Sequence, residues 1–82
     1  MKINVYGLGV VGLVTALRLC ENGFKVQGID ISKDVIDDLL LLKTRFYEPH
    51  LLDLLRKHLG KNFFPIMLND SNPADVQILC VG

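Results

Sequence analysis

The chain has 82 residues, and its 9 basic and 9 acidic side chains give a formal net charge of zero with both histidines neutral. A protein that binds nucleic acid through its charge would carry a basic stripe. The lysines and arginines here are scattered among carboxylates, so we expect no nucleic-acid partner. No uninterrupted apolar run is long enough to span a bilayer, so we expect no membrane partner. Asn4, Thr15 and Arg18 interrupt the apolar N-terminal stretch, which argues against a secretory signal and favours a cytoplasmic protein.

The first predicted strand, Lys2 to Tyr6, runs into the glycine-rich turn Gly7-Leu8-Gly9-Val10-Val11-Gly12. In a Gly-x-Gly-x-x-Gly turn the first glycine permits the tight bend, the second lets a pyrophosphate approach the backbone, and the third lets a helix pack closely on the strand. The helix that follows presents unpaired N–H groups and the positive end of its dipole to the anion. The residues assigned to the pyrophosphate are therefore Gly7, Gly9 and Gly12, with the amides of Val10 and Val11.

Leu13, Ala16, Leu17 and Cys20 recur at helical spacing, and Gly23 suits the end of this first helix. The second predicted strand, Lys25 to Asp30, ends on a carboxylate 18 positions beyond Gly12. A carboxylate at about this spacing accepts hydrogen bonds from the adenosine ribose hydroxyls and repels a 2′-phosphate. Asp30 therefore favours NAD over NADP. Lys33 lies nearby in sequence and would soften that preference if its ammonium group reached the same ribose.

Ser32 is predicted to cap a second helix, in which Val35, Ile36, Leu39 and Leu40 face inward. A third helix is predicted to begin near Pro49, which suits the first helical position, and to stop at Gly60. Two further strands, Phe63 to Leu68 and Val76 to Val81, flank a turn or very short helix at Asn69 to Pro73. We expect His50 and His58 to lie on the surface near helix ends, without a chemical role.

The alternation of strands and helices predicts an α/β fold with a parallel sheet. Right-handed crossovers favour the strand order 3-2-1-4, which is half of a doubly wound, Rossmann-like sheet. Residues 1–82 are interpreted as one dinucleotide-binding domain, incomplete and truncated, with its ligand crevice at the carboxyl ends of strands one and four. Cys20 and Cys80 are too few for a metal cage, so no metal is expected, and we interpret both as reduced core thiols.

Four blocks of this sequence resemble the N-terminal domain of the UDP-glucose/GDP-mannose dehydrogenases. They are Met1-Lys2-Ile3 through Leu13, Gly23 through Ser32, Tyr47-Glu48-Pro49, and Ile78-Leu79-Cys80-Val81-Gly82. The chain departs from the family pattern at Val35, where a basic residue is usual, and at His50, where glycine is usual. It also departs at Asn69 to Pro73, which is shorter than the helix of the family.

The resemblance implies an NAD-dependent enzyme that oxidises the C6 alcohol of a UDP- or GDP-sugar to the uronic acid. It places the backbone of Val81 and Gly82 near the nicotinamide half of NAD. It also implies that no catalytic residue lies in this chain, that the nucleotide sugar binds to parts of a longer protein, and that the parent protein is a homo-oligomer. The 82-residue chain alone would then be inactive.

Three alternatives remain open at this stage. A nucleotide-binding regulatory module would bind NAD or an adenosine nucleotide without turnover. A structural or interaction domain would use its glycines for packing alone and would show no nucleotide affinity. A flavin-dependent oxidoreductase would carry a yellow cofactor after purification.

Overall fold

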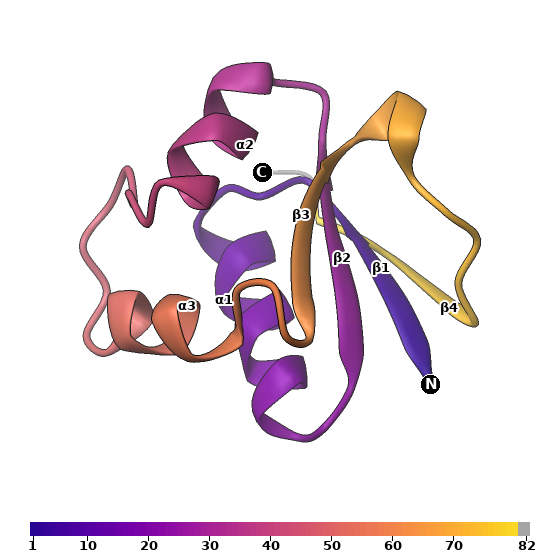
Figure 1. Cartoon of the computed structure of the whole chain (residues 1–82), viewed down its shortest axis with the longest axis horizontal. Helices are drawn as coiled ribbons and strands as arrows, with labels where there is room; N and C mark the ends of the chain where they lie inside the picture. Colours follow the sequence, from indigo (N-terminus) through magenta and orange to yellow (C-terminus); the bar gives the residue numbers. More distant parts are fainter. Residues whose placement is uncertain (81–82) are drawn as a thin grey trace.

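The computed structural model describes residues 1–80, in which strands and helices alternate along the chain (Figure 1). The strands are β1 (Lys2–Tyr6), β2 (Lys25–Asp30), β3 (Phe63–Met67) and β4 (Val76–Leu79). The helices are α1 (Val10–Glu21), α2 (Lys33–Leu40) and α3 (Leu51–His58), with a single 3-10 turn, η1 (Leu68–Asp70). The predicted elements are therefore all present.

The four strands form one parallel sheet in the order β3-β2-β1-β4. Val5 of the central strand β1 pairs with Gly28 of β2 on one side and with Ile78 of β4 on the other. The α/β fold and the strand order 3-2-1-4 are thus confirmed. The carboxyl ends of β1, β2 and β4 consequently meet at the edge of the sheet where the glycine-rich turn begins (Figure 1).

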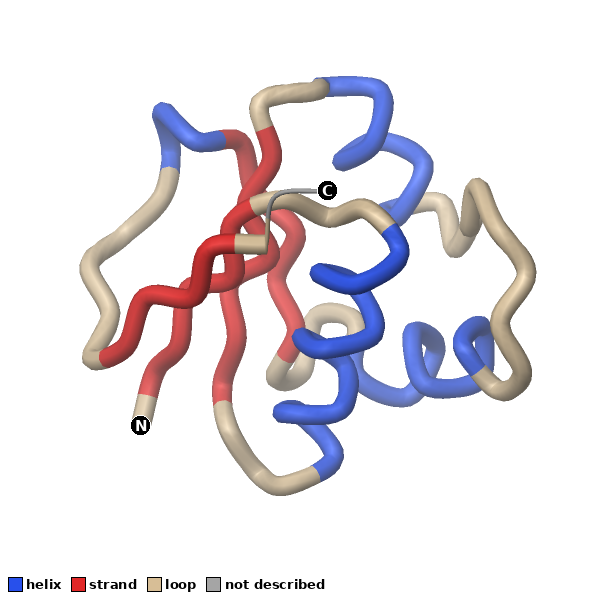
Figure 2. Tube along the Cα trace, turned by 180° about the vertical axis from the view of Figure 1, so that it is seen from behind, coloured by secondary structure: helices blue, strands red, loops and turns tan. Residues whose placement is uncertain are grey.

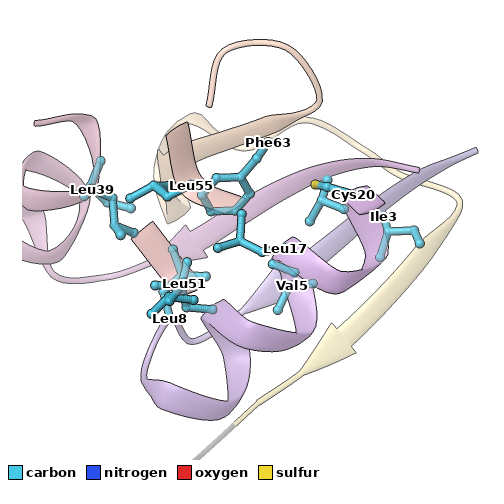
Figure 3. Packing of buried hydrophobic residues seen from close by; sticks show 13 residues of the cluster. Ile3, Val5, Leu8, Leu17, Cys20, Leu39, Leu51, Leu55 and Phe63 are labelled. Atoms are coloured by element: carbon cyan, nitrogen blue, oxygen red, sulfur yellow. The ribbon is translucent and has the colours of Figure 1, made fainter. Parts of the chain in front are cut away.

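The three α-helices lie on one side of the sheet, and η1 with the loop after it lies on the other (Figure 2). Helix α1 packs on β1 and β2, α2 packs on β2 and β3, and α3 packs against α1. The core fills the space between the sheet and these helices (Figure 3). Phe63, Leu17 and Leu55 are completely buried there, and burial of a side chain of this size contributes about 1.5–3 kcal/mol.

The opposite face of the sheet carries amide side chains that hold the connection between β3 and β4. Gln27 donates to the Asn72 carbonyl at 3.0 Å and accepts from the Asn72 amide at 3.1 Å. Gln27 also donates to Asn4, which is 1% exposed, at 2.9 Å. These hydrogen bonds fix the connection between β3 and β4, whose one helical element is the short η1 turn, in line with the turn or very short helix expected at Asn69 to Pro73.

His58 is buried, contrary to the expectation that it would lie on the surface. The residue is 6% exposed, and its ring joins two distant parts of the chain, with Nε2 at 2.9 Å from the Glu21 carboxylate and Nδ1 at 2.6 Å from Asn62 Oδ1. Lys57 donates to the same Glu21 oxygen at 2.8 Å. The cluster fastens the end of α3 to the end of α1, which local sequence spacing could not indicate.

The start of α3 also differs from the prediction. Pro49 precedes the N-cap, which is His50, so proline is not the first helical residue. His50 has a φ of +66° and lies in the left-handed region, where a side chain clashes with its own backbone. Glycine would occupy this position without that strain.

Replacing His50 by glycine is expected to raise the free energy of unfolding by about 0.5–1 kcal/mol. The left-handed conformation costs an L-residue about 1–2 kcal/mol, and the larger unfolded-state entropy of glycine offsets part of the gain. Urea denaturation at neutral pH measures the difference. His50→Ala is the matched control because it keeps the Cβ atom; a glycine variant no more stable than the alanine variant would contradict the strain argument.

The Glu21 cluster predicts a specific loss of stability in acid. Hydrogen bonds from Lys57 and then His58 hold the pKa of Glu21 below its ordinary value of 4.5. The depressed pKa stabilises the fold at pH values above about 4.5, and this contribution disappears as Glu21 becomes protonated in more acidic solution.

Urea denaturation of the wild-type chain and of Glu21→Gln over a series of pH values tests this effect. The wild type should be the more stable of the two near neutrality, and the difference should shrink as the pH falls below about 4.5. A difference that stays constant over the whole series would show that the carboxylate charge does not contribute.

Candidate cofactor site

Two of the three motif glycines are required by close packing. Gly7 has a φ of +92°, and a Cβ atom there would lie 2.1 Å from the Cys80 carbonyl oxygen. A Cβ atom on Gly12 would lie 1.7 Å from the Gly7 carbonyl oxygen. Any side chain at either position would force β1, β4 and α1 apart. These glycines therefore let the turn between β1 and α1 close tightly.

Gly9 differs from the other two, because a Cβ atom built on it would meet nothing within 4 Å. Gly9 is the N-cap of α1 and has an extended backbone conformation with no side-chain capping bond. The helix begins with Val10 and Val11, whose first-turn amides have no carbonyl partner within the helix. The open space over Gly9 thus adjoins free N–H groups and a positive dipole end, which together suit a phosphate group.

These residues line a cleft of about 520 Å³. Asp30, from the end of β2, and Cys80, just after β4, form its other walls. The structure therefore brings together most of the residues predicted to bind the dinucleotide, namely Gly7, Gly9, Val10, Val11, Gly12 and Asp30.

Asp30 connects the glycine-rich turn to the start of α2. Its Oδ2 accepts the Leu8 amide at 2.9 Å, and its Oδ1 accepts the Ser32 amide at 2.9 Å. Ser32 in turn caps α2 by accepting the Val35 amide. Each carboxylate oxygen has a further lone pair, so Asp30 retains acceptor capacity for ribose hydroxyls while it holds the turn.

A second cleft of about 340 Å³ shares Leu8, Gly9, Val10 and Asp30 with the first. The side chains of Val35, Leu39 and Phe46 give it apolar walls, and Asp38, Lys43 and Arg45 add charged groups. The two clefts therefore adjoin one another at the glycine-rich turn and Asp30. Sequence reasoning did not identify Lys43, Arg45 or Phe46, because no motif spacing marks the turn that follows α2.

Lys33 points to a different partner from the one expected. Its ammonium group forms an ion pair with Asp37 at 2.6 Å, one helical turn further along α2. Asp37 raises the pKa of Lys33, and Lys33 does not belong to the lining of either cleft. The expected contact between Lys33 and the ribose remains a prediction. Val81 and Gly82, expected near the nicotinamide, lie outside the described residues.

Cys20 is buried in the core, as expected, whereas Cys80 is only half-buried and lies on the wall of the first cleft. Burial raises the pKa of the Cys20 thiol to about 12, so Cys20 stays protonated and unreactive near neutrality. Its thiol lies 3.3 Å from the Asn62 carbonyl oxygen, to which it donates. In residues 1–80 no group of three or more His, Cys, Asp or Glu side chains is arranged to hold a metal ion. Over the same residues no helix is long and apolar enough to cross a membrane.

A further cleft of about 390 Å³ lies on the sheet face away from the α-helices, around Gln27, Phe64 and Asn72. It contains neither a helix terminus nor a glycine-rich turn. Among the clefts considered, the pair around Gly9 therefore offers the geometry that an extended anionic ligand requires.

The contrast between Gly9 and Gly12 leads to a matched pair of substitutions. Gly12→Ala should lower the free energy of unfolding by about 1–3 kcal/mol, because its methyl group has no room. Gly9→Ala should change stability by less than about 1 kcal/mol, chiefly through the weaker N-cap. It should nevertheless lower NAD affinity at least tenfold, about 1.4 kcal/mol, because its methyl group enters the space over the helix terminus.

Urea denaturation and calorimetric titration with NAD measure the two effects separately. Gly23→Ala is unsuitable as a control, because Gly23 has a positive φ and a side chain there would be strained. The wild-type chain is therefore the reference. A stable Gly9→Ala chain with unchanged NAD affinity would contradict the assignment of this space to the ligand.

Comparison with known proteins agrees with this geometry. Residues 1–82 match the UDP-glucose/GDP-mannose dehydrogenase family, NAD binding domain. The chain is 42% identical over 83 residues to the uncharacterized protein MJ1054 of Methanocaldococcus jannaschii, covering 100% of this chain and 9% of that protein.

Two solved structures have the same fold. A UDP-D-ManNAc dehydrogenase from Pyrococcus horikoshii superimposes with a TM-score of 0.92 at 31% identity, over 99% of this chain and 20% of that one. A GDP-mannose dehydrogenase from Pseudomonas aeruginosa, solved as a ternary complex, gives a TM-score of 0.84 at 34% identity, over 100% of this chain and 20% of that one. The chain thus spans about one fifth of each of these dehydrogenases and 9% of MJ1054. It belongs to the UDP-glucose/GDP-mannose dehydrogenase family, as its NAD-binding domain.

Proposed function

We propose that this chain is the cofactor-binding part of an NAD-dependent nucleotide-sugar 6-dehydrogenase. The enzyme would oxidise the C6 alcohol of a UDP- or GDP-sugar to the uronic acid. The observation that carries the proposal is the open space over Gly9, at the N-terminus of α1, with the Asp30 carboxylate on the wall of the same cleft. Family membership supports the assignment of the ligand as NAD.

Each residue of the site has a role that follows from its position. Gly7 and Gly12 let the turn close, so that the amides of Val10 and Val11 face the pyrophosphate. Asp30 accepts hydrogen bonds from the adenosine ribose hydroxyls. The backbone of Val81 and Gly82 is proposed to lie near the nicotinamide, and Lys33 to approach the ribose if it leaves Asp37. NAD, when bound, supplies the hydride acceptor for oxidation of the alcohol.

The remaining parts of the reaction are assigned to a longer protein. Full oxidation of an alcohol to a carboxylate passes two hydrides to two molecules of NAD and takes its second oxygen from water, with release of protons. The groups that move the protons and bind the sugar are proposed to lie outside residues 1–82. We expect a homo-oligomeric parent protein and a cytoplasmic setting, in which thiols such as Cys20 stay reduced. The chain alone is expected to bind NAD without turnover.

The discrimination between NAD and NADP tests the role of Asp30. The wild-type chain should prefer NAD, because the carboxylate binds the ribose hydroxyls and repels a 2′-phosphate. Asp30→Ala should weaken NAD binding and raise the ratio of NADP affinity to NAD affinity. Calorimetric titration of both cofactors gives this ratio.

The ratio is the useful quantity because Asp30 also holds the turn through Leu8 and Ser32. Loss of these hydrogen bonds would weaken the binding of NAD and of NADP by the same factor and leave the ratio of their affinities unchanged. Ser32→Ala, which removes the cap on α2 and keeps the carboxylate, is the matched control. An Asp30→Ala chain with the wild-type preference for NAD would refute the role of Asp30, and a folded wild-type chain that binds neither cofactor would refute the proposed function.

A further inference from the structure

The wall of the second cleft lacks a cation on α2. Val35 and Leu39 contribute apolar side chains to this wall, and the charged side chain that α2 contributes is that of Asp38. Lys33 is held by Asp37 on the exposed side of the helix. The positive charges that do line the cleft come from Lys43 and Arg45, in the segment that follows α2.

A strained turn brings this segment to the cleft. The Lys43 amide donates to the Asp38 carbonyl at 2.8 Å, and the Leu42 amide donates to the Leu39 carbonyl at 3.0 Å. These are the two hydrogen bonds of a Schellman motif, whose left-handed residue is usually glycine. Here that residue is Leu42, with a φ of +59°. The turn ends α2, and residues of the segment after it, Lys43, Arg45 and Phe46, line the second cleft together with residues of the helix.

Asp38 then fixes the direction of Arg45. Its carboxylate accepts Arg45 Nε at 3.0 Å, while its carbonyl holds Lys43. Within residues 1–80, the Arg45 side chain makes this one hydrogen bond, through Nε. Its two Nη groups therefore remain available to donate hydrogen bonds to a ligand. The Arg45 side chain is 51% exposed, and Phe46 beside it packs against the core. A planar guanidinium is thus held at the edge of an apolar cleft.

We propose that Arg45, positioned by Asp38, is a specificity-determining residue that binds the adenosine half of NAD through its guanidinium group. The inference rests on the proposed function. A guanidinium plane stacks on aromatic rings and donates in a fixed geometry, which suits an adenine ring between Arg45 and the apolar wall formed by Val35 and Leu39. The charged groups of the lining, Asp30, Asp38, Lys43 and Arg45, balance one another. The two carboxylates disfavour an adenosine that carries a 2′-phosphate, which the two cations would otherwise attract.

Calorimetric titrations of the folded chain with NAD, AMP and nicotinamide mononucleotide test the proposal. Arg45→Ala should lower the affinities for NAD and for AMP by a similar factor, about tenfold. It should leave the affinity for nicotinamide mononucleotide unchanged. Arg45→Lys should restore part of the loss, because an ammonium keeps the charge without the plane. Asp38→Asn should produce a smaller loss in the same direction. Arg56→Ala, which removes an exposed arginine of α3, is the matched control.

Thermal unfolding of each variant shows whether a loss of affinity comes from the fold. The proposal would be overturned if a folded Arg45→Ala chain bound NAD and AMP with the affinities of the wild type. It would also be overturned if Lys33→Ala lost more affinity for NAD than Arg45→Ala. A folded wild-type chain that binds neither NAD nor AMP would instead refute the proposed function, and the inference with it. Binding of NAD by the wild-type chain therefore distinguishes a failure of the Arg45 proposal from a failure of the proposed function.

Discussion

The site depends on one steric constraint, the contact between the glycine-rich turn and the two elements beside it. The Gly7 carbonyl lies where a Cβ atom of Gly12 would be, and the Cys80 carbonyl lies where a Cβ atom of Gly7 would be. These contacts allow β1, β4 and the start of α1 to approach one another without side chains between them. The approach is what exposes the first-turn amides of α1 at the sheet edge and leaves the space over Gly9 open.

Asp30 adds an electrostatic element to this steric arrangement. It stands at the end of β2 and accepts one amide from the glycine-rich turn and one from the cap of α2. Removal of its charge would therefore affect the turn, the helix and the ligand together. We propose that the same carboxylate gives the cleft a preference for ribose hydroxyls over a 2′-phosphate. The group proposed to discriminate between cofactors is then also one that maintains the fold.

The sequence predicted the strands, their order and the position of the glycine-rich turn, because each depends on local periodicity and on the handedness of crossovers. It did not predict the burial of His58, whose partners Glu21 and Asn62 come from other elements. It also missed the start of α3 after His50, since proline tolerates several positions near a helix end. Lys43 and Arg45 reach the cleft through a left-handed Leu42, a conformation that a leucine gives no reason to expect.

The central claim is that a dinucleotide lies across the N-terminus of α1, and backbone amide NMR during titration with NAD tests it most directly. The account predicts that the largest shift changes map to residues 7–12, to Asp30 and Ser32, and to residues 43–46. Residues on the opposite face of the sheet, such as Gln27 and Phe64, should change little. Shift changes centred on that opposite face, with none in the glycine-rich turn, would contradict the account.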